Sequence, residues 1–313
     1  MSLTDDLQVA PADAGSPKLP MTRSSILESE PGEKIMSDEM IEPGEILIQP
    51  LSGWIAINWR ELFDFRELLF FLAQRDVKIR YKQTALGVAW AVLQPLLTMI
   101  IFSIIFGRFV GLPSQDVPYP LFVFAGLIPW LFFSNGVTAA ASSLLNQQHL
   151  LTKIYFPRLF VPTASIGAFL VDMMISLVLY AFLLLAYGAV PGWRIIFLPF
   201  LILATVTATM GLGLTLAALT VKYRDVRYTV PFLMQILMYI SPVIYPITIV
   251  PDRYRWIAEL NPMCGLIDAY RSVILGTPWN PMAIFLGTIV NLAMLVFGVF
   301  YFRKTERLFA DIA

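Results

Sequence analysis

Six long apolar stretches alternate with charged loops along the chain from residue 83 onward. They contain no charged residue except Asp172 in the third stretch. Each is at least as long as the roughly 20 residues that a helix needs to cross hydrocarbon, where a helix satisfies its own backbone polar groups. The predicted spans cover residues 84–107, 120–141, 160–187, 195–220, 229–250 and 281–302. The pattern therefore predicts an all-α, polytopic membrane bundle of six transmembrane helices within residues 83–313.

Two further regions interrupt this series of spans. Residues 59–81, within the segment 53–82, mix apolar and aromatic residues with charges, which is typical of an amphipathic helix lying in the membrane interface. Residues 252–279 contain short apolar pieces broken by charges, Pro and Gly, and they predict short re-entrant or surface helices on the outer face. A plain membrane anchor and an ordinary surface loop are the respective alternatives.

Small residues occupy one face of the fourth predicted span. Spacings of three and four place the following residues on the same side of a helix: Ala204, Ala208, Gly211, Thr215 and Ala218. Such a face lets a second helix approach closely. It predicts a packing surface and not a substrate site.

The composition supports a membrane protein and excludes an ordinary soluble domain. Of the 313 residues, 58% are hydrophobic and 14% are charged, whereas soluble domains carry about a quarter charged residues. The first 50 residues hold ten acidic and three basic side chains and lack the pattern of a signal peptide. We predict that residues 1–52 form an acidic, disordered cytoplasmic extension.

The distribution of Lys and Arg predicts the orientation of the chain. If the spans alternate, one side of the membrane receives twelve basic residues: Arg75, Lys78, Arg80, Lys82, Lys153, Arg158, Lys222, Arg224, Arg227, Arg303, Lys304 and Arg307. The other side receives five Arg residues, including Arg253 and Arg271, partly offset by acids. Because cytoplasmic loops carry the excess of basic residues, both termini are expected in the cytoplasm.

The chain lacks the patterns of an enzyme or of a nucleotide-binding protein. It has no phosphate-binding loop, no nucleophile-elbow pattern and no zinc-protease helix. The single Cys264 and the single His149 exclude an internal disulfide and a multi-histidine metal site. We therefore predict no catalytic residue, no cofactor site, no metal site and no nucleic-acid partner for this chain.

Asp172 is the one carboxylate well inside a predicted span. An ionisable group at that depth is costly and faces the bundle interior or water. A transport role is one interpretation, and pairing with a nearby polar group for structural reasons is the favoured one.

Aromatic residues in and beside the spans could form a path for a sugar chain, because sugars stack their flat C–H faces on aromatic rings. The candidates are Trp90, Phe102, Phe106, Trp130, Phe132, Phe133, Tyr239 and Tyr245. The alternative is an ordinary role, since Trp and Tyr gather at membrane interfaces in any case.

Two compact basic loops, residues 144–157 and 222–227, are candidates for docking a soluble motor. Their charge alone is equally explained by topology.

Several strings in the sequence carry a resemblance to a known family. They are RDVKIRYKQT at 75–84, LGVAWAVLQPLL at 86–97, YPLFVFAGLIPW at 119–130, LLTKIYFPR at 150–158, KYRDV at 222–226 and NPMCGLIDAYR at 261–271. From about Gly53 to its end, the chain resembles the membrane subunit of type-2 ABC exporters. Within these it is similar to the branch that exports O-antigen, capsule and teichoic-acid polysaccharides.

The resemblance implies a homodimeric permease in the bacterial cytoplasmic (inner) membrane that exports a lipid-linked polysaccharide. ATP and Mg would bind a separate ATPase subunit, so this chain would not itself be an enzyme. The implied residues for coupling to the ATPase are Leu150, Leu151, Lys153, Tyr155, Phe156, Arg224 and Asp225. The implied residues of an interfacial gate helix are Arg75, Asp76, Lys78, Arg80 and Tyr81.

Three other functions stay open at this point. The first is a type-2 exporter of a drug, a lipid or another small amphiphile. The second is an integral-membrane enzyme acting on lipid-linked sugars, which would need a cluster of catalytic side chains. The third is a membrane scaffold without transport.

Overall fold

The computed structural model describes residues 63–82, 87–151 and 156–306. These residues belong to the unit Gly53–Ala313. The other unit, Met1–Ser52, is not among the described residues, so the prediction that residues 1–52 are disordered is not tested. Every regular element in the described part of the chain is a helix, which confirms the all-α class. The helices are α2 (Arg66–Lys82), α3 (Val88–Phe102), the π-helix η1 (Ser103–Phe109), α4 (Tyr119–Asn146), α5 (Gln148–Leu151), α6 (Phe160–Ala186), η2 (Trp193–Phe197), α7 (Leu198–Lys222), α8 (Val226–Ile240), η3 (Ile247–Ile249), α9 (Asp252–Glu259), α10 (Pro262–Leu275) and α11 (Pro281–Glu306).

Five helices in the described residues are long and apolar enough to cross a membrane. They are Ala89–Phe109, Tyr119–Asn146, Phe160–Ala186, Trp193–Lys222 and Pro281–Glu306, and each coincides with a predicted span. The chain is therefore a multi-pass membrane protein with a helical bundle.

The span predicted at 229–250 is not a single long helix in the structure. Its helix, α8, has only 15 residues and ends at Ile240, so it is about 22 Å long against a hydrocarbon core of about 30 Å. The next residue, Ser241, is extended with ψ of 146°. That conformation is the expected one, because Pro242 disfavours a helical residue before it. The predicted count of six spans is thus not confirmed.

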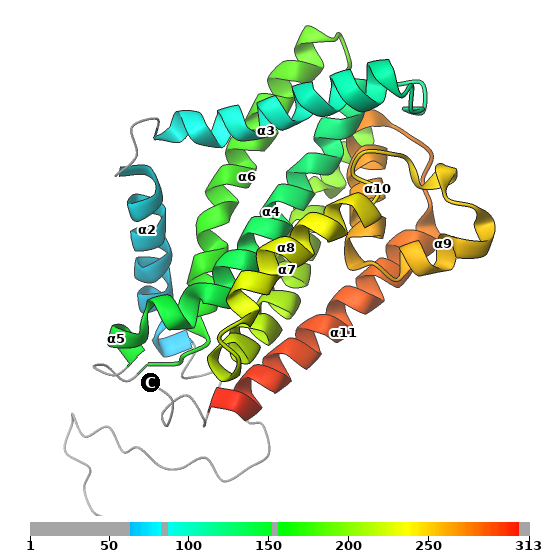
Figure 1. Cartoon of the computed structure of the whole chain (residues 1–313). Helices are drawn as coiled ribbons and strands as arrows, with labels where there is room; N and C mark the ends of the chain where they lie inside the picture. The colour runs from blue at the N-terminus through cyan, green and yellow to red at the C-terminus, as the bar shows by residue number, and fades with distance from the viewer. Residues whose placement is uncertain (1–62, 83–86, 152–155, 307–313) are drawn as a thin grey trace, which may run out of the picture. The chain divides into compact units, whose positions relative to one another are not determined.

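Helix α4 occupies the centre of the bundle, in contact with α3, α6, α7, α8 and α10 (Figure 1). Of its most apolar window, 78% is buried, against 28% or less in the other four long helices. Those four helices turn much of their apolar surface outward. Such surface is suited to lipid, because lipid solvates an apolar exterior that water would not.

The small-residue face of α7 packs against α11, as its spacing predicts. A Cβ atom added to Gly211 would lie 2.7 Å from the backbone of Met294 and Leu295, and one added to Gly298 would overlap the carbonyl oxygen of Gly211. The two backbones are therefore in direct contact, which only glycine permits. Gly298 is the partner that the sequence did not single out.

The region 252–279 forms two short helices, α9 and α10. Helix α10 begins with Pro262 after Asn261, whose side chain accepts a hydrogen bond from the amide of Met263, and it ends at Gly276 with φ of 73°. This is the usual pairing of a polar N-cap with a left-handed glycine at the C-terminus. Most of α10 is buried against α4, α7 and α11. A re-entrant position in the membrane stays a prediction.

Candidate functional site

Helix α2 packs along the first half of α6 (Figure 1). Leu72 is buried in a cluster with Leu144, Phe160 and Phe302, and Ala73 lies against Gly167 of α6. Glu67 in its first turn and basic residues in its last turn suit the helix dipole. Since α2 stands beside α6, the predicted gate residues are held against a membrane span.

Asp172, in the middle of α6, is paired with two predicted gate residues. The Nη2 atom of Arg80 lies 2.7 Å from Oδ2 of Asp172, and the hydroxyl of Tyr81 donates a hydrogen bond to Oδ1. Burial and the carboxylate of Asp172 both raise the pKa of Tyr81, so its hydroxyl stays a donor. The structure thus agrees with a pairing role for Asp172, whose partners come from α2.

Asp76 makes a second polar contact between α2 and α6, and its neighbour Arg75 pairs with it within α2. Nε and Nη2 of Arg75 donate to Oδ1 of Asp76 at 3.1 Å and 2.8 Å, and the hydroxyl of Ser165 donates to Oδ2 of Asp76 at 3.2 Å. Lys78 is instead exposed on another side of α2. Four of the five predicted gate residues therefore make polar contacts within this junction, and Lys78 does not.

A cavity of about 600 Å³ lies between α2, α4 and α6. Its lining includes Arg75, Asp76, Ile79 and Arg80 from α2, Ala139, Ser142, Ser143 and Asn146 from α4, Gln147 after α4, and Ser165, Ala168 and Phe169 from α6. A second, much smaller pocket of about 20 Å³ lies beside Asp172, with Gln94 and Asn135 among its lining residues. That volume suits about one water molecule. Polar side chains thus line two spaces, one between α2, α4 and α6 and the other between α3, α4 and α6.

The predicted coupling residues lie in two places. Leu150 and Leu151 belong to α5, while Lys153 and Tyr155 lie outside the described residues. Phe156 is buried in the cluster that holds Leu72. Arg224 and Asp225 are exposed in the turn between α7 and α8.

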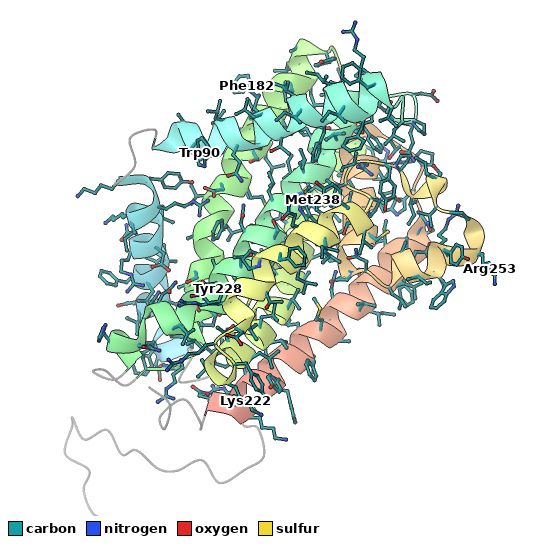
Figure 2. All side chains as sticks on the ribbon, in the orientation of Figure 1. Trp90, Phe182, Lys222, Tyr228, Met238 and Arg253 are labelled. Atoms are coloured by element: carbon teal, nitrogen blue, oxygen red, sulfur yellow. The ribbon has the colours of Figure 1, made fainter. Side chains whose placement is uncertain are left out.

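The basic helix ends gather at one end of the bundle. Arg158, just before α6, donates to the carbonyl of Glu306 at the end of α11, and Figure 2 places Lys222 near this end and Arg253 at the opposite one. Arg158, Lys222 and Arg253 lie as the predicted division of charge requires, whereas Arg80, counted on the same side as Lys222, reaches Asp172 in the middle of α6. Which end faces the cytoplasm stays a prediction.

The predicted aromatic path is not assembled on one surface of the single chain. Trp130, Phe132 and Phe133 are buried in the core around α4. Trp90 and Tyr239 are 51% and 54% exposed on α3 and α8. The other three are partly buried: Phe102 meets Phe106 edge to face at 5.7 Å, and the Tyr245 hydroxyl donates to the carbonyl of Ile240.

Arg271 of α10, which the sequence assigns only to the outer side of the membrane, is a buried cation. Its guanidinium lies 3.6 Å from the centre of the Phe122 ring. It donates to the carbonyl oxygens of Val243 at 2.7 Å, Phe122 at 3.2 Å and Tyr245 at 3.4 Å. Burial lowers its pKa to about 10, and nearby Asp268 opposes that shift, so Arg271 is charged at neutral pH. The signal in the sequence was its position within the apolar run of residues 262–275.

Comparison with known proteins identifies the family. The model of the family described as "ABC-2 type transporter" matches residues 67–275, from α2 to the end of α10. The chain belongs to the ABC-2 type transporter family. This ABC-2 chain is 35% identical over 217 residues to the O-antigen export system permease protein RfbA of Myxococcus xanthus, covering 68% of the chain and 82% of the relative. The predicted family is therefore confirmed.

Two further relatives align with most of the ABC-2 chain. It is 26% identical over 263 residues to the O-antigen export system permease protein RfbA of Klebsiella pneumoniae, covering 84% of the chain and the whole relative. It is 24% identical over 244 residues to the polysialic acid transport protein KpsM of Escherichia coli, covering 74% of the chain and 91% of the relative. The family model, which matches residues 67–275, contains the junction of α2 with α6.

Proposed function

We propose that this chain is the permease subunit of an ABC transporter that exports a lipid-linked polysaccharide across the bacterial cytoplasmic membrane. The observation that carries the proposal is its similarity to relatives named for two different polysaccharides, O-antigen and polysialic acid, over 68–84% of the chain. A similarity shared by both kinds of relative favours a common cargo class over one particular sugar.

Energy for the transport would come from a separate ATPase subunit that binds ATP and Mg. The turn with Arg224 and Asp225 and the segment that begins with α5 would dock this partner. The position of these two segments supports docking there, because the helices α4 and α7 pack side by side and end at them. Both termini of the chain would then lie in the cytoplasm on the same side as the partner.

A homodimer would complete the path for the polysaccharide. Helix α8 supports this, because Tyr228, Phe232, Gln235 and Tyr239 are exposed and their spacing places them on one helical face. Aromatic rings and an amide can hold a sugar chain weakly at many points, so that it slides without stalling. A second copy facing this surface would shield it from lipid. The lipid anchor of the substrate would travel beside the bundle.

Reconstitution with the partner ATPase tests the proposed function. We expect the complex in lipid vesicles to raise its ATP turnover when a lipid-linked polysaccharide is added, and to move that glycan across the bilayer. Stimulation by small amphiphiles with no response to glycans would favour a drug or lipid exporter. Nucleotide hydrolysis by this chain alone would contradict the proposal that a separate subunit binds and hydrolyses ATP.

A further inference from the structure

A buried segment without helical structure follows α8. The helix ends at Ile240, and residues 241–246 form turns and bends in which 241–244 and 246 are buried. Backbone of this kind cannot satisfy all of its own carbonyl oxygens, and at membrane depth it persists only where the surrounding protein supplies donors. The donors for this segment are therefore the groups that decide its position.

Arg271 of α10 supplies donors to two carbonyl groups of this segment. Its Nη2 atom donates to Val243 at 2.7 Å, and its Nη1 atom donates to Tyr245 at 3.4 Å. Its Nε atom donates to the carbonyl of Phe122 in α4 at 3.2 Å, and the Phe122 ring centre lies 3.6 Å from the guanidinium. One guanidinium serves three acceptors because its five N–H donors form a rigid planar fork. Arg271 thus ties the segment after α8 to both α4 and α10.

Tyr245 extends this contact to the end of α8. Its carbonyl accepts from Arg271, and its hydroxyl donates to the carbonyl of Ile240 at 2.8 Å. The last carbonyl groups of a helix have no partner within the helix, so a side-chain donor there satisfies the helix end and fixes it. A continuous chain of contacts therefore runs from Arg271 through Tyr245 to the last residue of α8.

The last turns of α8 have little other support. The structure describes the whole of this helix, and its buried residues are Val230 and Met234, with none after Met234. Tyr239, in the last turn, is 54% exposed. The position of that turn consequently depends on the segment that follows it.

We propose that Arg271 is a positioning residue that acts through Tyr245 to fix the last turn of α8, and with it the exposed ring of Tyr239. The consequence for transport rests on the proposed function, in which this face of α8 lines the polysaccharide path. Arg271 itself would not touch the polysaccharide, because it is only 1% exposed. A fixed ring can contact a sugar without the loss of conformational entropy that a mobile one would incur.

Spin-label spectroscopy on the full chain in lipid nanodiscs tests the placement. With the single cysteine removed as Cys264→Ala, a label is attached to Tyr239→Cys near one end of α8 or to Tyr228→Cys near the other (Figure 2). We expect Arg271→Gln to sharpen the spectral lines of the label at residue 239 and to leave the label at residue 228 unchanged. Arg271→Lys keeps a cation with donors and should restore part of the immobilisation, and Arg253→Gln, at an exposed arginine of α9, should change neither spectrum.

A second variant keeps the buried charge in place. Tyr245→Phe removes only the hydroxyl that caps Ile240, so we expect the same loosening at residue 239 to a smaller extent, even where Arg271→Gln fails to fold. In the complex with the ATPase, Tyr245→Phe is expected to lower the maximal rate of glycan-stimulated ATP turnover by about fivefold, the effect of one hydrogen bond. The KM for ATP should stay unchanged, because the nucleotide would bind the other subunit.

The outcomes separate this proposal from the proposed function. Unchanged spectra at residue 239 in both Arg271→Gln and Tyr245→Phe would overturn the placement, and so would equal sharpening at residues 228 and 239, which reports a general loss of packing. Loosening at residue 239 with unaltered turnover would overturn the role in transport. If the unaltered complex responded to no glycan, the proposed function would fail, while the spectra would still decide whether Arg271 positions α8.

Discussion

Arg80 of α2 and Asp172 of α6 form an ion pair, with Nη2 of the arginine 2.7 Å from Oδ2 of the carboxylate. The pair joins the helix that precedes the first span to the middle of another span. Its two side chains are 34% and 18% exposed, so it is neither a surface pair nor a fully buried one. A carboxylate at this position in α6 would be costly alone, and the arginine and Tyr81 together offset that cost.

Removing one partner of this pair is expected to destabilise the protein. We predict that Asp172→Asn or Arg80→Gln lowers the free energy of unfolding by about 1–2 kcal/mol, between the values typical of exposed and buried pairs. Thermal unfolding in detergent measures the change. The double variant should lose less than the sum of the single losses, because the two residues share one interaction. Additive losses would contradict the pairing.

The contact of Arg271 with α4 depends on the glycine at position 126. A Cβ atom there would lie 2.9 Å from Nη2 of Arg271 and 3.2 Å from the carbonyl oxygen of Val243. We predict that Gly126→Ala destabilises the protein by about 1–3 kcal/mol, as overpacking does in a filled core. The melting temperature of the purified chain measures this. Gly192→Ala is the control, because a Cβ atom at Gly192 has no neighbour within 4 Å.

The direct backbone contact between α7 and α11 gives a third prediction. Gly298→Ala must push the two helices apart, since the added methyl group would overlap the carbonyl of Gly211. We expect a loss of at least about 2 kcal/mol and a sharp fall in folded protein. Gly167→Ala, whose new Cβ atom would make an ordinary contact with Ala73 at 3.7 Å, should fold like the unaltered chain. Equal yields of both variants, measured by size-exclusion chromatography, would contradict the close approach.

Charge at the turn between α7 and α8 is expected to matter for coupling. We predict that Arg224→Glu lowers stimulation of the partner ATPase about tenfold, because a charge-assisted contact would become a repulsive one. The rate of phosphate release by the reconstituted complex measures this. Arg253→Glu makes the same change at the opposite end of the bundle, where no docking is proposed (Figure 2). A loss of stimulation in Arg253→Glu alone would contradict the proposal, because the ATPase would then bind at the end of the bundle that contains Arg253.

The aromatic residues should separate into two groups on substitution. Tyr239→Ala is expected to slow export of the polysaccharide and to leave the fold intact, because this side chain is 54% exposed. Trp130→Ala is expected to destabilise the protein by about 3–5 kcal/mol, because its ring is buried in the core. Surface polysaccharide on intact cells and thermal unfolding of the purified variants measure the two effects. Unchanged export in Tyr239→Ala, at normal protein levels, would remove α8 from the path.

Local sequence patterns predict the faces and ends of single helices, but they do not predict which helices contact one another. The small-residue face of α7 was evident from spacing, but its partner Gly298 was not, because one sequence does not say which helices meet. Pro242 indicates that α8 ends just before it, but the apolar residues that follow Pro242 led to the prediction of one continuous span. Arg271 was counted only as a basic residue of the outer side. Its contact with three carbonyl oxygens could not be predicted, because these oxygens come from segments that are far apart in the chain.

The sequence by itself determined the all-α class, the five long apolar helices and the family. The length of an apolar stretch and the order of short sequence motifs are local properties that can be read from one chain. The tertiary structure alone decided that Asp172 meets Arg80 and Tyr81, that three predicted path aromatics are core residues, and that a polar cavity lies between α2, α4 and α6. Lipid accepts any apolar helix face, so hydropathy cannot say which faces meet one another. Packing of the whole bundle selects those faces, and with them the positions of the polar groups.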